Sequence, residues 1–227
     1  MYETVVFRRL CANIMIMSTL IENKLWKNPL LYLTENQLAH YLGGTEDSVD
    51  ARIRRAVEKK LLIRAKRGLY YLGERLAARW HHPFELAQFI YGPSYISLES
   101  AMSYHQLIPE RVYAVTSATG KRNKEFNSSG QIFSYQTLPA ENLLIGVEHV
   151  REGDYQFLMA TPWKAILDYI YCHKMDWDSV DPLEESLRIE LEDLVKIRYS
   201  DLMQFQVFYH SGRMDRFIEN IPPGLIV

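Results

Sequence analysis

TENQLAHYLGGTEDSVDARIRRAVEKKLLIRAKRGLYYLG, residues 34–73, contains the signals that decide the fold of the first part of this chain. Thr34 and Gln37 are spaced as a capping box, in which a hydroxyl caps the helix and an amide side chain reaches back. The helix that follows has one apolar stripe, formed by Leu38, Ala39 and Leu42. Gly43 and Gly44 are expected to end it in a tight turn, because glycine tolerates positive φ.

A second helix is predicted directly after this turn. Thr45 can cap it, and Glu46 and Asp47 suit the positive end of its dipole. Its apolar face consists of Val49, Ile53, Val57 and Leu61. The adjoining polar stripe, at about 100° per residue, consists of Thr45, Ser48, Arg52, Arg55 and Lys59. Hydroxyls at the start of a helix and cations further along suit a helix that enters a DNA groove.

Two apolar runs, residues 61–64 and 68–72, flank the segment Ala65-Lys66-Arg67 and predict a β-hairpin with a basic tip. The hairpin residues expected to contact DNA are Arg64, Lys66 and Arg67. Two helices joined by a tight turn and followed by a basic hairpin predict a winged helix-turn-helix.

Charge is concentrated in the same segment. Residues 52–67 hold eight Lys or Arg and one Glu, a net charge of +7, whereas the whole chain carries −2. A basic island on an otherwise acidic protein predicts one defined surface for a nucleic-acid backbone. The alternative is a solvated helix face on a winged helix that contacts only proteins.

Length and composition, 227 residues with 48% apolar side chains, fit a soluble protein with one large or two small domains. We expect a winged helix-turn-helix over residues 1–75 and an α+β domain over 76–227. The apolar stretch at 14–17 is far short of the roughly 20 residues that span a bilayer. No secretion signal is visible, and two cysteines without metal spacing favour a cytoplasmic protein.

The remaining periodicity outlines both domains. Residues 4–26 are predicted to be helical, residues 30–33 to form a strand beside the hairpin, and residues 74–83 to be a connector. In the second domain, β-branched and aromatic runs predict a small, mainly antiparallel sheet, with strands at 112–117, 131–136, 143–147 and 155–160.

Helices are expected before and after this sheet. Two precede it, at 84–90 and 98–105. Two more begin at Thr161-Pro162 and Asp181-Pro182, because proline suits the first helical position. The second of these is predicted to bury Leu183, Leu187, Leu191 and Leu194. Helices over 200–209 and 212–220 complete an α+β fold.

Other polar groups were weighed as sites. Lys121, Arg122 and Lys124 lie between two predicted strands, where they could bind phosphate or RNA, or could simply form a solvated loop. The histidines lack metal-site spacing. A serine-rich stretch near Glu99 and His105 lacks the nucleophile elbow of a hydrolase. Asp168 and Glu99 could serve a nuclease, but no two-metal carboxylate cluster is visible. We therefore predict no catalytic residue, metal or cofactor.

Several motifs after the hairpin resemble those of the AbiEi-type antitoxins, predicted regulators of bacterial abortive-infection toxin–antitoxin systems that defend against phage. The resemblance rests on YGPSYISLESA at 91–101, HQLIP at 105–109, VTSAT at 115–119, Lys121-Arg122 with Phe126, and TPWKAILD at 161–168. RGLY at 67–70 also fits. It covers about residues 34–175.

The resemblance implies a transcriptional autoregulator that binds inverted repeats in its own promoter through an N-terminal winged helix. It also implies a C-terminal domain that antagonises a nucleotidyltransferase-type toxin, in a type IV (AbiE-like) system, without a stable complex. The chain departs from the family pattern at Trp163, where an acidic residue is more usual. A winged-helix transcription factor whose second domain senses a small molecule, with no toxin partner, is the alternative.

Overall fold

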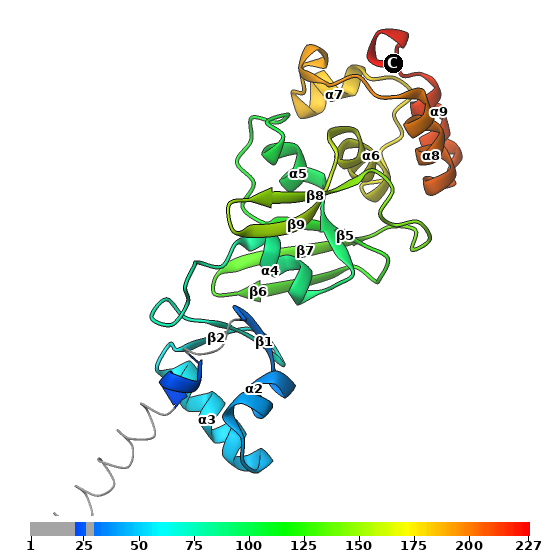
Figure 1. The fold of residues 1–227 in the computed structure, drawn as a ribbon. Coiled ribbons are helices and arrows are strands. Elements are labelled where there is room, and N and C mark those ends of the chain that lie inside the picture. Colours follow the sequence, from blue (N-terminus) through cyan, green and yellow to red (C-terminus); the bar gives the residue numbers. More distant parts are fainter. Residues whose placement is uncertain (1–20, 26–29) are drawn as a thin grey trace, which may run out of the picture. The chain divides into compact units, whose positions relative to one another are not determined.

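The computed structural model describes residues 21–25 and 30–227. The chain divides into two compact units, one up to His81 and one from His82 to Val227. This boundary falls within the predicted connector, residues 74–83. Each unit combines helices with its own β-sheet (Figure 1).

The first unit contains a three-stranded antiparallel sheet in the order β1-β3-β2. Strand β1 (Tyr32–Thr34) leads into helix α2 (Glu35–Leu42) and helix α3 (Glu46–Glu58). Strands β2 (Leu62–Lys66) and β3 (Leu69–Leu72) follow as a hairpin, and β1 pairs with β3 close to the predicted position. Most of the predicted helix over residues 4–26 lies outside the described residues, and 21–25 are helical.

Local sequence explains the two helices. The capping box is present, because the Thr34 hydroxyl accepts from the Gln37 amide and the Gln37 side chain accepts from the Thr34 amide. Gly43 and Gly44 have φ of 66° and 107°, values that only glycine adopts readily. A Cβ on Gly44 would lie 2.5 Å from Ser48 Oγ, so any larger residue at this position would also force the Ser48 side chain to move.

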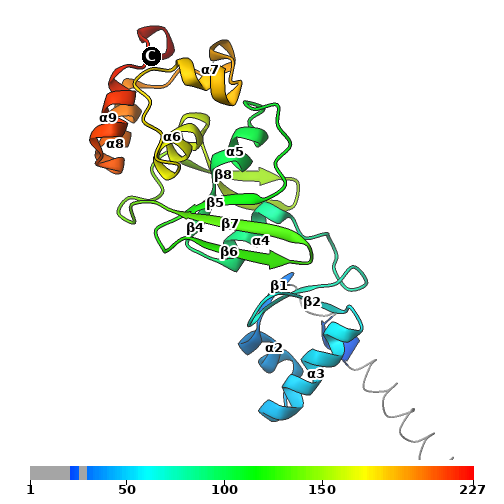
Figure 2. The same ribbon diagram turned by 180° about the vertical axis from the view of Figure 1, so that it is seen from behind.

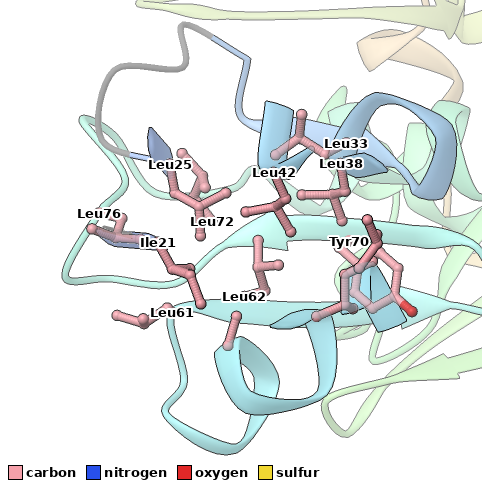
Figure 3. Close-up of a cluster of buried hydrophobic side chains, with 13 residues drawn as sticks. Ile21, Leu25, Leu33, Leu38, Leu42, Leu61, Leu62, Tyr70, Leu72 and Leu76 are labelled. Atoms are coloured by element: carbon pink, nitrogen blue, oxygen red, sulfur yellow. The ribbon is translucent and has the colours of Figure 1, made fainter. Parts of the chain in front are cut away.

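Apolar side chains from every element of this unit form one core (Figure 3). Leu38 and Leu42 enter it from α2, and Val49 and Ile53 enter it from α3, as predicted. Ala56 completes the α3 contribution, whereas Val57 is only partly buried. Each fully buried Leu, Val or Ile contributes about 1.5–3 kcal/mol, so this core fixes the outward direction of the opposite α3 face.

The second unit is built on a six-stranded mixed sheet in the order β6-β7-β5-β4-β9-β8. Its strands are β4 (Ser94–Ile96), β5 (Val115–Thr119), β6 (Lys124–Ser128), β7 (Gln131–Thr137), β8 (Val147–Glu152) and β9 (Tyr155–Ala160). β5 runs parallel to β7, and β4 runs parallel to β9. The other three pairings are antiparallel.

Three details of this sheet differ from the sequence prediction. The strand expected over 143–147 is wrong: the segment is a turn, and β8 begins at Val147. Gly146 has a φ of 69°, which interrupts extended backbone there. β4 and β6 were not predicted, since β4 has three residues and β6 is a largely exposed edge strand with little apolar signal (Figure 2).

Helices cover both faces of the sheet. They are α4 (Pro83–Ile90), α5 (Leu98–Tyr104), α6 (Pro162–Cys172), α7 (Asp181–Leu187), α8 (Tyr199–Tyr209) and α9 (Gly212–Glu219). Tyr95 of β4 points to α6, where its hydroxyl bonds to Asp168. Tyr135 of β7 points to the other face, where its hydroxyl bonds to the Ala87 carbonyl of α4. Because Tyr95 pairs with Ala118, and Ala118 with Gln136, strand alternation places α4 and α6 on opposite faces.

The predicted leucine face after Pro182 is only partly correct. Leu183 is fully buried on α7. The helix ends at Leu187, because Arg188 adopts the left-handed conformation with a φ of 55°. Leu194 is buried from a separate segment beyond that turn, and Leu191 begins a short 3₁₀ helix.

Candidate nucleic-acid interface

The start of α3 presents two hydroxyl groups. Thr45 occupies the N-cap position and is exposed, but its side chain makes no capping hydrogen bond, contrary to prediction. Ser48 donates its hydroxyl to the Thr45 carbonyl at 2.7 Å. The Thr45 hydroxyl therefore remains available to an external acceptor such as a phosphate oxygen.

Arg52 has a different position from the one predicted. It is half-buried, and its guanidinium donates to the carbonyl oxygens of Leu42, at 2.9 Å, and Gly43. The Lys24 ammonium donates to the same Leu42 carbonyl at 2.8 Å. Both cations thus bind the negative end of α2. Arg52 therefore stabilises the α2–α3 turn, and in a nucleic-acid interface its main role would be to position α3.

Arg55 and Lys59, further along the stripe, are exposed. Arg55 forms no hydrogen bond or salt bridge with any described side chain. Three of the four acids of α3, Asp47, Asp50 and Glu58, lie on the other side of the helix by its 3.6-residue period, and the fourth, Glu46, is its first residue. The Arg55–Lys59 side of α3 is therefore cationic, whereas the opposite side combines these acids with the exposed Arg54.

The hairpin carries the remaining predicted residues. Arg64 and Arg67 are exposed without a salt bridge in the part of the chain that the structure describes, and Lys66 is half-buried. A register shift between Arg64 and Lys66 marks a β-bulge, and Gly68 has a φ of 76° in the turn. The Gly68 carbonyl accepts from the Glu35 amide at 3.1 Å, which ties the hairpin tip to α2.

The predicted second basic site lies in the loop after β5 and at the first residue of β6, Lys124. Lys121, Arg122 and Lys124 are all exposed. Lys121 donates to the Gly92 carbonyl and lies 5.2 Å from the centre of the Tyr91 ring. Lys124 lies 5.3 Å from the Phe126 ring centre. Two of the three cations thus have intramolecular partners, whereas Arg122 forms no hydrogen bond or salt bridge with any described residue.

A buried charge cluster in the second unit was not predicted as a unit. Asp168 and Lys164, one turn apart on α6, are both 0% exposed and are joined by a 2.5 Å hydrogen bond. Asp168 also accepts from the hydroxyls of Tyr95 at 2.8 Å, Ser97 at 2.6 Å and Tyr209 at 2.7 Å. The cluster therefore connects β4, the start of α5, α6 and α8.

Aromatic rings surround the Lys164 ammonium. It lies 3.9 Å from the ring centre of Phe208 and 4.7 Å from that of Tyr209. Burial lowers the pKa of Lys164, and the nearby Asp168 charge only partly restores it. Burial also raises the pKa of Tyr95 and Tyr209, and Asp168 adds to both shifts, so these hydroxyls stay protonated and donate.

The cluster is buried and internally satisfied. Each Asp168 oxygen accepts two hydrogen bonds, so the buried carboxylate is satisfied. Neither cavity described below is lined by Lys164 or Asp168. The sequence signal for it was an i, i+4 Lys–Asp pair inside an otherwise apolar helix.

The serines and histidines considered for catalysis are separated from one another. Ser97 bonds to Asp168, whereas Ser100 bonds to Thr116 and Ala114. His105 contacts the Ala160 carbonyl at 2.8 Å. His173 Nε2 lies 3.3 Å from a Glu99 carboxylate oxygen, within hydrogen-bond distance. Across residues 21–25 and 30–227, no three His, Cys, Asp or Glu side chains gather as metal ligands.

No protein-family model matches the chain, and a search of curated proteins finds no significant match. Among the described residues, no helix combines the length and apolar character needed to cross a membrane.

Proposed function

We propose that the first unit is a winged helix-turn-helix that binds duplex DNA. In this assignment α3 enters the major groove and the β2–β3 hairpin is the wing beside it. The supporting observation is that Arg55, Arg64 and Arg67 are exposed and form no salt bridge with any described residue, on the two elements that would meet the duplex. Counterions held near such cations are released when phosphates replace them, which favours binding.

Gel-shift titration with duplex DNA from the region upstream of the gene tests this proposal. Arg55→Ala and Arg67→Ala should each weaken binding. Each should also reduce the slope of log affinity against log salt by about one, the value for one lost phosphate contact. Arg151→Ala removes an exposed arginine from β8 of the other unit and is the matched control. Equal salt slopes for all three variants would refute the interface.

We further propose that the protein is a transcriptional autoregulator and antitoxin of a type IV, AbiE-like system, and not an enzyme. Support comes from the sequence motifs that resemble AbiEi-type antitoxins. Its partners would be operator DNA with inverted repeats and a nucleotidyltransferase-type toxin. Co-expression with the adjacent gene product tests this half. Restored growth is expected, while a toxic neighbour that stays lethal beside a soluble, folded partner would contradict it.

One observation favours the ligand-sensing alternative. A cavity of about 440 Å³ lies beside Trp163 of α6 and Phe205 of α8, with Lys196 and Glu148 also in its wall. Its size and mixed lining are those of a small-molecule site. A bound ligand would raise the melting temperature by mass action. A metabolite screen by thermal shift, with DNA affinity measured for each hit, separates this function from the antitoxin.

A further inference from the structure

A second cavity, of about 570 Å³, lies in the second unit where the end of β7, the C-terminus of α6 and the start of α9 come together. Hydrogen-bond donors dominate its wall, and no carboxylate lines it. Its polar residues include Asn123, Gln136, Lys174, His210, Ser211 and Arg213. The lack of acids in this hollow contrasts with the segment 176–201, which follows Lys174 closely in sequence and carries nine acids and three bases.

Arg213 lines the cavity and offsets the negative carbonyl end of α6. Its guanidinium donates to the carbonyl oxygens of Ile170 at 2.9 Å, Tyr171 at 3.3 Å and Met175. The Ile170 and Tyr171 carbonyls belong to the negative end of α6, which would otherwise repel an anion, and Met175 follows that end. Burial raises the pKa of the Cys172 thiol to about 12, so this wall residue adds no negative charge. The cavity therefore keeps the positive charge of Lys174.

Several donors in the wall are unused. The Asn123 side-chain oxygen accepts from the Thr137 amide at 2.7 Å, which fixes the group and leaves its NH₂ free to donate. Ser211 makes no capping hydrogen bond with its hydroxyl. The Lys174 ammonium has no hydrogen bond or salt bridge to any described residue. These donors come from three different chain segments.

We propose that this cavity binds the terminal phosphoryl group of a nucleotide, either free or at the 5′ end of an RNA. A phosphoryl dianion offers three strong acceptor oxygens, which match a cation and several N–H and O–H donors better than one carboxylate would. Tyr171 also lines the cavity, and its ring lies 5.3 Å from that of Tyr209 between centroids, so a base could stack only on the other face. The proposed site shares no residue with the proposed DNA interface. In the β5–β6 loop it uses Asn123, whereas the sequence pointed to the neighbouring cations.

Calorimetric titration of the full chain with ADP and with adenosine tests the phosphoryl requirement. ADP should bind and adenosine should bind at least about tenfold more weakly, the factor equivalent to about 1.4 kcal/mol. Lys174→Glu should weaken ADP binding by a similar factor. Lys196→Glu makes the same charge change at the other cavity and should leave ADP binding unchanged. Equal binding of ADP and adenosine, or equal effects of the two lysine variants, would overturn the proposal.

A second variant distinguishes loss of ADP binding at the site from loss of the folded structure. Asn123→Asp keeps the acceptor for the Thr137 amide but replaces the NH₂ donor with negative charge, so ADP binding should fall while the melting temperature stays unchanged. An undiminished ADP affinity in this variant would also refute the site.

Short RNAs with a 5′-phosphate or a 5′-hydroxyl identify the source of the phosphoryl group. These titrations use Arg55→Ala/Arg67→Ala protein, so that the first unit does not contribute. Tighter binding of 5′-phosphorylated RNA than of ADP indicates an RNA end, whereas tighter binding of ADP indicates a free nucleotide. ADP affinity should be the same in this background as in the natural chain, so the DNA-binding proposal and this one can fail separately.

Discussion

Arg55 on α3 and Lys164 on α6 are both cations on amphipathic helices, yet their surroundings are opposite. Arg55 is exposed and has no partner among the described residues, whereas Lys164 is fully buried and bonded to Asp168. A charge in water costs little to hold and can exchange its counterions for a phosphate backbone. A charge removed from water must be compensated inside the protein. The exposed cation is therefore available for binding, and the buried one serves cohesion.

The largest expected effect comes from breaking the buried pair. Asp168→Ala leaves Lys164 and three donors without their acceptor, and should destabilise the second unit by about 3–5 kcal/mol. Urea unfolding followed by circular dichroism measures the loss. The double variant Lys164→Met/Asp168→Leu removes both charges and should lose less than Asp168→Ala does. A single variant that stays within about 1 kcal/mol of the natural chain would show that the pair is not structural.

Arg52 and Arg55 allow the same comparison within one helix. Arg52→Ala removes hydrogen bonds from a charged donor to the α2–α3 turn, so a loss of about 1.5–3 kcal/mol in the first unit is expected. Arg55→Ala removes a side chain that has no hydrogen bond or salt bridge to any described residue, and should change stability by less than about 0.5 kcal/mol. The melting transition of the first unit is the measurement. Equal losses from both variants would contradict the positioning role of Arg52.

A smaller difference in stability is expected between alanine variants of the two N-cap threonines, Thr34 and Thr45. Thr34→Ala removes the capping box of α2 and should cost about 1 kcal/mol. Thr45→Ala removes a side chain that makes no cap bond, so its cost should be smaller, while DNA affinity should fall if its hydroxyl contacts phosphate. Chemical denaturation compares the two variants. A Thr45→Ala loss as large as that of Thr34→Ala would mean that Thr45 does cap α3.

The smallest effect is expected from a half-buried pair on the second unit. Burial opposes the charge of Glu99, but hydrogen bonds from His173 and from its own backbone amide outweigh burial, and the pKa of Glu99 is lowered. A lowered carboxyl pKa stabilises the fold fully above the unfolded value, about 4.3, and this contribution is lost as the pH falls through the folded-state pKa. The stability of Glu99→Gln should therefore decline less between pH 5 and pH 3 than that of the natural chain, by acid titration of unfolding. Identical acid profiles would exclude a contribution from Glu99.

Local rules were sufficient where neighbouring residues decide the structure. The capping box at Thr34, the glycine turn and the helix starts before Pro162 and Pro182 were all located from sequence, because each depends on contacts within one turn. The same rules failed for β6, an exposed edge strand that shows no apolar period. They also failed for residues 143–147, where the apolar run ends in a positive-φ glycine.

The site residues divide in the same way. The exposure of Arg55, Arg64 and Arg67 followed from the position of each on its own helix or hairpin. The hydrogen bonds of Arg52 could not be predicted in this way, because its acceptor, the Leu42 carbonyl, is ten residues away and is brought close by the packing of α2. The donor-lined cavity could not be predicted from the sequence either, since Asn123, Lys174 and Ser211 are far apart in the chain.

By itself, the sequence determined the α2–turn–α3–hairpin order, the mixed α+β class and the basic island at residues 52–67. Those properties depend on composition, period and short-range backbone preference. Only the tertiary structure decided which charges reach solvent, which are clamped to a helix end, and that Tyr95, Ser97 and Tyr209 converge on Asp168. Such partners are 41 to 73 residues apart. Desolvation and hydrogen bonding act through space, so only the packed fold specifies them.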